Sequence, residues 1–310
     1  MLKQRLIIGP TLAILALLLF WLDERLERVR APQWWLEDRE YLPGGLVLFF
    51  GSLLIIPLAA RELSAIVRAN GIATRTWLTT FAAMLGVTLS YAIPTKLTTP
   101  INIATAIAII PTGLIAIFVL ALFTFSRRKN VAGVAAAAGA VIFAMVYLGL
   151  MLGFLLAIRR WHSAWWIVGV IAVTKMTDTG AYFTGRAIGR HKLIPWLSPG
   201  KTWEGLTGGI ATAVLTGMFV AWLSHFIPPP VDPAMPPDYE HAPIWVGAVC
   251  GVLFAVVGQF GDLTMSLFKR GAGLKDSSNV LPGMGGVLDV MDSPLMVAPV
   301  AFWALLLLTG

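Results

Sequence analysis

Long apolar runs with almost no charge are the feature that most constrains what this chain can fold into. Several runs reach the ~20 residues that a helix needs to cross the hydrocarbon core of a bilayer. Strands of a membrane barrel would alternate apolar and polar residues at every second position, whereas these runs are unbroken. The runs predict nine spanning helices, at residues 6–22, 44–60, 77–93, 101–125, 132–157, 164–183, 205–227, 244–265 and 294–309.

The shortage of charge extends along the whole chain. Only 13% of the 310 residues are charged and 57% are hydrophobic, whereas about a quarter of a typical soluble domain is charged. The composition therefore excludes a soluble domain with one anchor and predicts an all-α polytopic membrane protein. Cys250 has no second cysteine to pair with, and the four His are scattered without the spacing of zinc ligands.

The distribution of Lys and Arg between the runs predicts the orientation of the chain. Most of these residues lie in alternate connecting segments, which also include the two loops at 184–204 and 266–293. Fewer lie in the remaining connections, where Arg159 and Arg160 follow the fifth run. Because cytoplasmic loops are enriched in Lys and Arg, the bias places the N-terminus and both of these loops in the cytoplasm.

Three other connecting segments have distinctive compositions. Residues 23–43 carry charges of both signs with Trp34 and Trp35, which is typical of an external helix at headgroup depth, and the Pro-rich, acidic segment 228–243 predicts an extended external connector. Segment 61–75 is short, basic and amphipathic, so it can lie on anionic headgroups. A simple solvated connector is the alternative for both 23–43 and 61–75.

The loop at 266–293 combines the residues that a polyphosphate and a divalent metal require. Three cations fall within seven residues, at Lys269, Arg270 and Lys275, and glycines around them free the backbone to approach a ligand. Carboxylates follow or precede them, at Asp262, Asp276, Asp289 and Asp292. Clustered carboxylates suit Mg²⁺, which bridges to substrate phosphates. The alternative is a set of ordinary inner-face cations with glycine turns.

Asp289 and Asp292 are the strongest metal candidates in that loop. They lie three residues apart, so on a helix they share one face at the entrance to the last span. Carboxylates at membrane depth are costly and are usually retained for function. We expect Asp289 to be exposed in a cleft, where a metal ion can reach it.

A second polar cluster lies at 174–209. Lys175 and Asp178 are three residues apart within the sixth run, and a structural ion pair between them is one interpretation. Ser198, Lys201 and Thr202 belong to a turn that resembles a phosphate-binding loop without the Walker A spacing. The alternative is an ordinary helix cap, with Thr202 at the N-terminus of the seventh span.

These two clusters resemble the phosphatidate cytidylyltransferase family, also called CDP-diacylglycerol synthases. The segments D-x-x-A-Y-F-x-G-R at 178–186, H-K-L at 191–193 and S-P-x-K-T-W-E-G at 198–205 fit the family pattern, as does Q-x-G-D at 259–262. The residues that match the family's C-terminal signature in register are Ser266, Phe268, Lys269, Arg270, Lys275, Asp276, Ser278, Leu281, Pro282, Gly285, Gly286, Asp289 and Asp292. The resemblance covers the C-terminal half, and the N-terminal half matches mainly in hydropathy.

The resemblance implies a reaction of CTP with phosphatidic acid that gives CDP-diacylglycerol and pyrophosphate, as part of phospholipid biosynthesis. It implies a catalytic cleft at the cytoplasmic side of the inner (plasma) membrane. The expected partners are CTP, phosphatidic acid and membrane lipids, with no nucleic acid, and a homodimer stays open. Residues 1–130 would supply the N-terminal spans one to four, and residues 131–310 the C-terminal catalytic bundle of spans five to nine.

The resemblance also assigns roles to the polar residues. Asp262, Asp289 and Asp292 are implied ligands of Mg²⁺, and a second cation stays open. Lys269, Arg270 and Lys275 would hold phosphates.

Further implied roles concern the substrate. Ser198, Lys201 and Thr202 would hold the CTP tail or the lipid phosphate. Asp178 would orient one of the cations, Asp276 would bind metal or fix Lys275, and Arg186 belongs to the matched substrate-binding segment.

Two positions depart from the family pattern. Met284 stands where the family has His, and Val290 stands where it has Arg. These changes remove a hydrogen-bond donor and a possible phosphate contact, while the carboxylates are kept.

Two other functions compete with this reading. A CTP-dependent polyprenol or phytol kinase would transfer the γ-phosphoryl group and release CDP. A transporter would use Lys175 and Asp178 as a coupling pair, although it would need intramembrane charges in more than one span.

Overall fold

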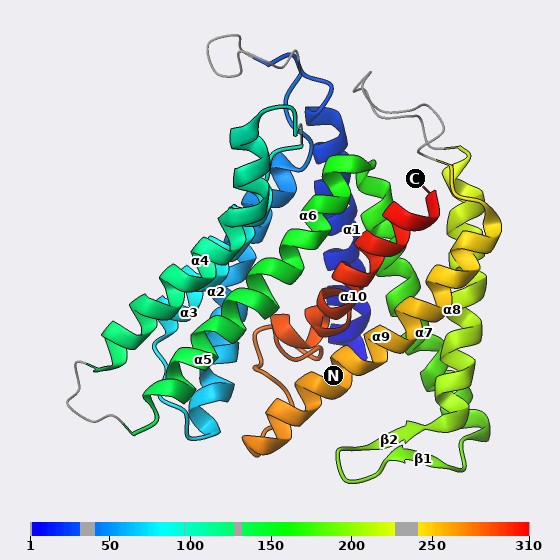
Figure 1. The fold of residues 1–310 in the computed structure, drawn as a ribbon. Coiled ribbons are helices and arrows are strands. Elements are labelled where there is room, and N and C mark those ends of the chain that lie inside the picture. Colours follow the sequence, from blue (N-terminus) through cyan, green and yellow to red (C-terminus); the bar gives the residue numbers. More distant parts are fainter. Residues whose placement is uncertain (1, 32–40, 96, 127–131, 227–240, 310) are drawn as a thin grey trace. The chain divides into compact units, whose positions relative to one another are not determined.

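The structure is a computed structural model that describes residues 2–31, 41–95, 97–126, 132–226 and 241–309 (Figure 1). Within these residues, each of the nine predicted apolar runs coincides with a helical segment. The prediction of a helical chain is therefore confirmed. Trp34, Trp35 and most of the predicted connector at 228–243 lie outside the described residues.

The described chain contains ten α-helices, one π-helical segment (η1) and two short strands. The helices of the first half are α1 (Leu2–Leu26), α2 (Leu46–Ala69), α3 (Thr76–Ala92), α4 (Pro100–Ser126), α5 (Val134–Ala144), η1 (Met145–Leu150) and α6 (Met151–Trp161). The second half contributes α7 (Ala164–Ile188), β1 (Lys192–Ile194), β2 (Ser198–Thr202), α8 (Trp203–Ser224), α9 (Ile244–Gly271) and α10 (Val287–Thr309).

Six helical segments of the described chain are long and apolar enough to cross a membrane, so the protein is a multi-pass helical membrane protein. They are α2, α4, the continuous stretch Val134–Trp161, α8, α9 and α10. The helix α3 has 17 residues, and α7 interrupts its apolar run with Lys175 and Asp178. That all nine runs span the bilayer stays a prediction.

Several helices extend beyond their apolar runs into polar sequence. The helix α2 continues to Ala69, so the first part of the predicted amphipathic segment 61–75 forms its last turns. The helix α9 continues to Gly271, and α10 begins at Val287, seven residues before the predicted span. Because a helix satisfies its own backbone hydrogen bonds, it need not end where the apolar residues end.

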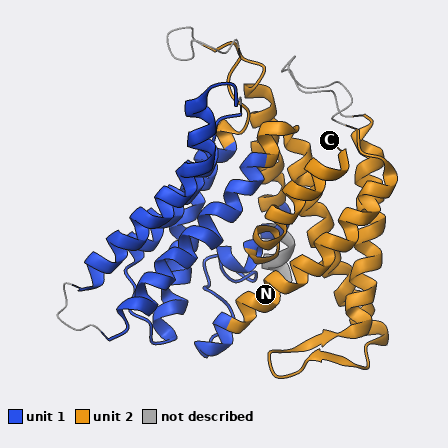
Figure 2. Cartoon of the chain, in the orientation of Figure 1, with its two compact units in different colours: residues 1–10, 48–157, 268–291 blue, residues 11–47, 158–267, 292–310 orange. Residues whose placement is uncertain are grey.

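The chain forms two compact units, which Figure 2 shows in different colours. Unit 1 contains residues 1–10, 48–157 and 268–291, and unit 2 contains residues 11–47, 158–267 and 292–310. The division at residue 130, which the sequence suggested, stays a prediction about function.

The core of unit 1 lies among α3, α4 and α5. Small and large apolar residues interdigitate there, and the fully buried members include Leu78, Ile117, Val141 and Met145. The π-helical turn η1 widens the helix opposite α3, where a Cβ on Gly86 would lie 2.8 Å from the Met145 carbonyl oxygen. Small residues let the two backbones approach this closely.

Unit 2 has α7 packed against α8 through small residues. A Cβ on Gly205 would lie 2.9 Å from the Ala181 carbonyl oxygen, and one on Gly209 would lie 2.9 Å from the Thr177 carbonyl oxygen. These two glycines are one helical turn apart, so they form a strip along which α7 lies directly on the α8 backbone.

A two-stranded antiparallel hairpin connects α7 to α8. In its register Lys192 lies opposite Thr202, and Ile194 lies opposite Ser198. The chain is all-α apart from this short hairpin, in which the segment between the helices pairs with itself. The hairpin carries the predicted phosphate-binding turn from Ser198 to Thr202 as its second strand.

At the other end of unit 2, one buried arginine holds three carboxylates of the α1 end. The side chain of Arg159 is 1% exposed, and its Nε lies 2.6 Å from Oδ2 of Asp23, which is also 1% exposed. Its Nη2 lies 2.5 Å from Glu27 and 3.5 Å from Glu24. We call these four residues the Arg159 cluster. The Arg159 side chain also donates to the carbonyl oxygen of His162 at 3.1 Å.

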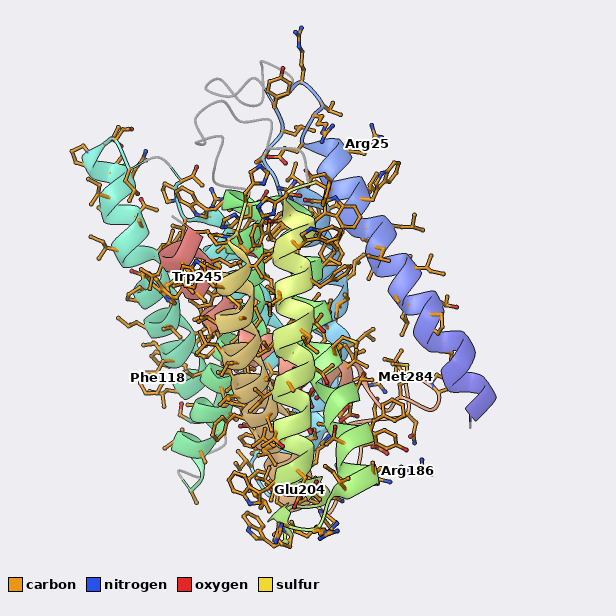
Figure 3. All side chains as sticks on the ribbon, turned by 90° about the vertical axis from the view of Figure 1, so that its right-hand side faces the viewer. Arg25, Phe118, Arg186, Glu204, Trp245 and Met284 are labelled. Carbon is orange, nitrogen blue, oxygen red and sulfur yellow. The ribbon has the colours of Figure 1, made fainter. Side chains whose placement is uncertain are left out.

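The carboxylates of the Arg159 cluster also bind backbone amides. Asp23 accepts hydrogen bonds from Gly45 N and Val47 N at 3.0 and 2.9 Å, and Glu24 accepts from Ala164 N at 2.9 Å. The cluster therefore joins the ends of α1 and α6 to the starts of α2 and α7. Figure 3 shows Arg25 at this end of unit 2, and Arg186 and Glu204 at the hairpin end.

Candidate functional site

In unit 1, the predicted candidates Lys269 and Asp289 come together. Lys269 lies in the last turn of α9 and Asp289 in the first turn of α10, and Lys269 Nζ lies 2.5 Å from Asp289 Oδ1. Their side chains are 9% and 10% exposed. The expectation of an exposed Asp289 is wrong, because the loop 272–286 folds over this pair.

Asp289 is also held by the loop and by its own helix. Its Oδ2 accepts hydrogen bonds from Gly286 N at 2.8 Å, from Ser277 N at 2.8 Å and from Ser277 Oγ at 2.9 Å. An acidic side chain at the third helical position that reaches back to the amide before the helix is half of a capping box. The positive end of the helix dipole favours the carboxylate there.

Sequence reasoning missed Glu62, which belongs to the same cluster. It lies in α2 and is 4% exposed. Its carboxylate accepts from Ser277 Oγ at 2.9 Å, from Ser278 Oγ at 2.6 Å, and from the amides of Val287 and Leu288 at 3.0 and 2.9 Å. We call Glu62, Lys269, Ser277 and Asp289 the Asp289 cluster.

A signal for Glu62 was present in the sequence. The residue follows directly on the apolar run of 44–60, so it continues a helix at a depth where an unpaired carboxylate is costly. The basic residues around it suggested instead an amphipathic stretch on headgroups or a solvated connector. The structure places Glu62 on the buried side of α2, between Ala60 and Leu63, which are both fully buried.

The other charged residues of the loop are open to solvent. Arg270, Lys275 and Asp276 are exposed, whereas the neighbouring Ser277 is buried. Exposed Arg and Lys side chains suit a phosphate ligand, which supplies the opposite charge. Met284 and Val290, the two departures from the family pattern, are both half-buried.

A second pair of candidates meets in unit 2. Lys201 Nζ, on β2, lies 2.5 Å from Asp262 Oδ2, on α9, and the two side chains are 18% and 34% exposed. The predicted pairing of Lys175 with Asp178 is confirmed at 3.9 Å within α7. This is the structural alternative for these two residues, and the implied role of Asp178 in orienting a phosphate-binding cation stays a prediction.

Thr202 caps α8, which confirms the structural alternative for this residue. Its Oγ1 accepts a hydrogen bond from Gly205 N at 3.0 Å, and the residue is 5% exposed. Ser198 is half-buried at the other end of β2. Exposed Arg186 donates to the hydroxyl of Tyr182 at 3.0 Å (Figure 3).

Asp292 is the remaining metal candidate and is buried, at 4% exposure. Its Oδ1 accepts from Ser293 N at 2.7 Å, so part of the carboxylate is engaged by its own helix. Asp292 and Asp262 belong to unit 2, whereas Asp289 belongs to unit 1. A metal ion shared by Asp262, Asp289 and Asp292 stays a prediction.

The donor chemistry of these residues fits a hard divalent cation. In the described part of the chain, no three His, Cys, Asp or Glu side chains lie close enough to form a metal site by themselves. Asp262 and Asp289 each face one lysine ammonium group instead. Mg²⁺ usually takes only one or two protein carboxylates and completes its shell with water and phosphate, so it would compete with a lysine ammonium group for these carboxylate oxygens.

Known proteins that are similar to this chain point to one family. Residues 41–308 match the family described as the Cytidylyltransferase family. The similar curated proteins include three named phosphatidate cytidylyltransferase. The Haemophilus influenzae protein is 41% identical over 140 residues, which are 45% of this chain and 45% of that protein. The Pseudomonas aeruginosa protein is 40% identical over 157 residues, which are 50% of this chain and 53% of that protein.

The similarity to the third relative extends further along the chain. The Chlamydia muridarum protein is 32% identical over 195 residues, which are 60% of this chain and 60% of that protein. The chain thus spans about half the length of the curated relatives that it matches.

Proposed function

The chain belongs to the cytidylyltransferase family, and we propose that it transfers the cytidylyl group of CTP to phosphatidic acid. The products are CDP-diacylglycerol and pyrophosphate. The observation that carries the proposal is the Asp289 cluster, where a largely buried and multiply held carboxylate lies in the same segment, 266–293, as exposed Arg270 and Lys275. The names of the relatives support the choice of phosphatidic acid as the acceptor.

The reaction needs no nucleophile from the protein. An oxygen of the lipid phosphate attacks the α-phosphorus of CTP, and the bond from that phosphorus to the bridging oxygen of the β-phosphate breaks. The electron pair leaves with pyrophosphate, so negative charge accumulates on the leaving group. Groups that stabilise developing charge supply the largest share of such catalysis.

The cationic residues of the chain are suited to that task. Arg270 and Lys275 are exposed and can bind the phosphates of CTP, while Lys201 can neutralise one of the two phosphate compounds as it approaches. Lys269 is fixed by Asp289, so it offers a positive charge that need not reorganise during the reaction. Mg²⁺, when bound by Asp289, Asp262 or Asp292, would offset charge between the two substrates.

The membrane arrangement follows from the same proposal. With the N-terminus in the cytoplasm and nine spans, both polar loops lie on the cytoplasmic face of the inner membrane, where CTP is available. A cleft open to this face and to the bilayer would let a soluble nucleotide meet a lipid. This orientation rests on the distribution of Lys and Arg.

The proposal is tested with the purified full-length protein in mixed micelles that contain CTP, phosphatidic acid and Mg²⁺. We expect equal amounts of pyrophosphate and CDP-diacylglycerol, and no product when Mg²⁺ is chelated. Release of CDP without pyrophosphate would identify a lipid kinase instead. Movement of a solute into proteoliposomes without CTP would favour a transporter.

A further inference from the structure

We propose that Glu62 is a positioning residue that sets the geometry of Asp289 through Ser277. The inference rests on the proposed function, in which Asp289 belongs to the site. It adds a residue from α2, far from the polar loops in the sequence. The four groups that donate hydrogen bonds to the Glu62 carboxylate all lie in the segment 277–288.

Glu62 binds the start of α10. Its two carboxylate oxygens accept from Val287 N and Leu288 N, the first two amides of α10, which have no partner within the helix. Glu62 therefore caps α10 from a different helix. It fixes the start of α10, which carries Asp289 in its first turn.

The hydroxyl group of Ser277 lies between the carboxylates of Glu62 and Asp289. Ser277 Oγ lies 2.9 Å from Glu62 Oε2 and 2.9 Å from Asp289 Oδ2. A serine hydroxyl has one hydrogen, so it can donate fully to only one of the two carboxylates at a time. The position of Glu62 therefore decides how strongly Ser277 Oγ binds Asp289, and the two carboxylates are coupled.

The Asp289 cluster is closely packed. A Cβ added to Gly286 would meet Ser277 Oγ and the Glu62 carboxylate at distances that real side chains do not adopt. Gly286 also donates its amide to Asp289 at 2.8 Å. Close packing of this kind means that a change at Glu62 is transmitted to Asp289 and is not absorbed by empty space.

A second serine provides a matched control. Ser278 Oγ donates to Glu62 Oε1 at 2.6 Å and accepts a hydrogen bond from Val280 N at 3.2 Å. Ser277→Ala removes the hydroxyl that both carboxylates share, whereas Ser278→Ala removes a hydroxyl that binds Glu62 alone. If Glu62 acts through Ser277, the two neighbouring variants should differ.

The experiment is a double-mutant cycle on the full-length protein with CTP, phosphatidic acid and Mg²⁺. We expect Glu62→Gln and Ser277→Ala each to lower kcat about tenfold to a hundredfold, the range seen when groups that orient a metal ligand are removed. The KM for CTP should stay within about twofold, because exposed Arg270 and Lys275 are unchanged. The double variant should be no worse than the more impaired single variant, because both changes break one pathway.

A second measurement does not depend on activity. Hydrogen exchange in the peptide 272–291 should be faster in Glu62→Gln than in wild type, while exchange in 134–157 of the same unit is unchanged. This arm separates the two proposals, since it can succeed or fail even if wild-type protein makes no CDP-diacylglycerol. Exchange that is unchanged in 272–291, or faster throughout unit 1, would overturn the positioning role.

Three kinetic outcomes would also overturn it. They are wild-type kcat in folded Glu62→Gln, multiplicative losses in the double variant, and equal losses in Ser277→Ala and Ser278→Ala. If Glu62→Gln does not fold, the comparison of the two serine variants still decides the matter. Equal activities of Ser277→Ala and Ser278→Ala would then reject the shared hydroxyl as the link.

Discussion

The Arg159 cluster and the Asp289 cluster each bury one cation beside acidic side chains, three in the first cluster and two in the second, but they differ in what surrounds them. Arg159 is 1% exposed and binds three acidic side chains of the α1 end, which in turn bind backbone amides at helix ends. Lys269 pairs with Asp289 beside a glycine-rich loop that carries exposed Arg270 and Lys275.

The cations themselves suit these two settings. The planar guanidinium of Arg159 binds several partners in fixed directions and does not lose its proton, which suits a permanent link. The ammonium group of Lys269 is a compact point charge. Another cation can compete with it for Asp289, and a phosphate can compete with Asp289 for the ammonium group. Burial of charge alone therefore does not identify a functional site, and the difference lies in the solvent-exposed groups nearby.

The largest expected effect is the loss of Arg159. Arg159→Met would leave Asp23, Glu24 and Glu27 without their cation in a buried site, at a cost of about 3–5 kcal/mol in the free energy of unfolding. Thermal unfolding in detergent measures it, with exposed Arg28→Met as the control. Equal unfolding temperatures for the two variants would show that the Arg159 cluster does not stabilise the fold.

The pH dependence of stability should come from the same region. Burial lowers the pKa of His162 to about 4, from an ordinary value of 6.5. Between these values the unfolded chain binds a proton that the folded chain does not, so stability falls as the pH drops from 6.5 to 4, by roughly 3 kcal/mol in all. His162→Asn should flatten the pH profile of unfolding in that window, and a profile identical to wild type would argue against a neutral His162.

Asp289→Asn should reduce activity more than stability, whereas Arg159→Met should mainly reduce stability. Activity should fall at least about a hundredfold, equivalent to about 2.7 kcal/mol in the activation barrier. The protein should still fold, since the amide oxygen keeps an acceptor for Ser277 N although the ion pair with Lys269 is lost. Product formation and circular dichroism measure the two properties, with the exposed loop variant Asn279→Ala as the control. Wild-type activity of Asp289→Asn would remove this cluster from the site.

The smallest expected effect is that of a change at Thr202 in the hairpin. It tests whether this residue is structural, like the Arg159 cluster, or binds substrate. Because Thr202 caps α8, Thr202→Ala should reduce the free energy of unfolding by about 1 kcal/mol. Thr207→Ala, an exposed change one turn along the same helix, is the control. Unchanged stability together with a raised KM for CTP would place Thr202 with the substrate-binding residues and not with the caps.

The apolar runs of the sequence predicted where the helices are. Their predicted ends were wrong, because several helices continue into polar residues. The runs at 44–60, 244–265 and 294–309 each continue into charged sequence within the same helix. The consequence was largest for Glu62, which was assigned to a connector and is instead part of α2. The hairpin at 192–202 was missed because three-residue and five-residue strands carry too little pattern to identify.

The site could be predicted in part from local residue types. The loop with Lys269, Arg270, Lys275 and Asp289 was identified by its charges and glycines, and the pairing of Lys175 with Asp178 followed from their spacing. Arg159 was counted as an ordinary loop cation because nothing in its own neighbourhood indicates three acidic partners more than a hundred residues away.

The amino-acid order by itself determined the helical membrane class, the family and the candidate chemistry, because each depends on composition, period or short motifs. Which carboxylate is paired with which cation was decided only by the tertiary structure. Asp289 meets Lys269 and Ser277, Lys201 meets Asp262, and Arg159 meets the end of α1, since these contacts arise when distant segments pack and exclude water. A charge can be recognised in the sequence, but its burial depends on what the folded chain places over it.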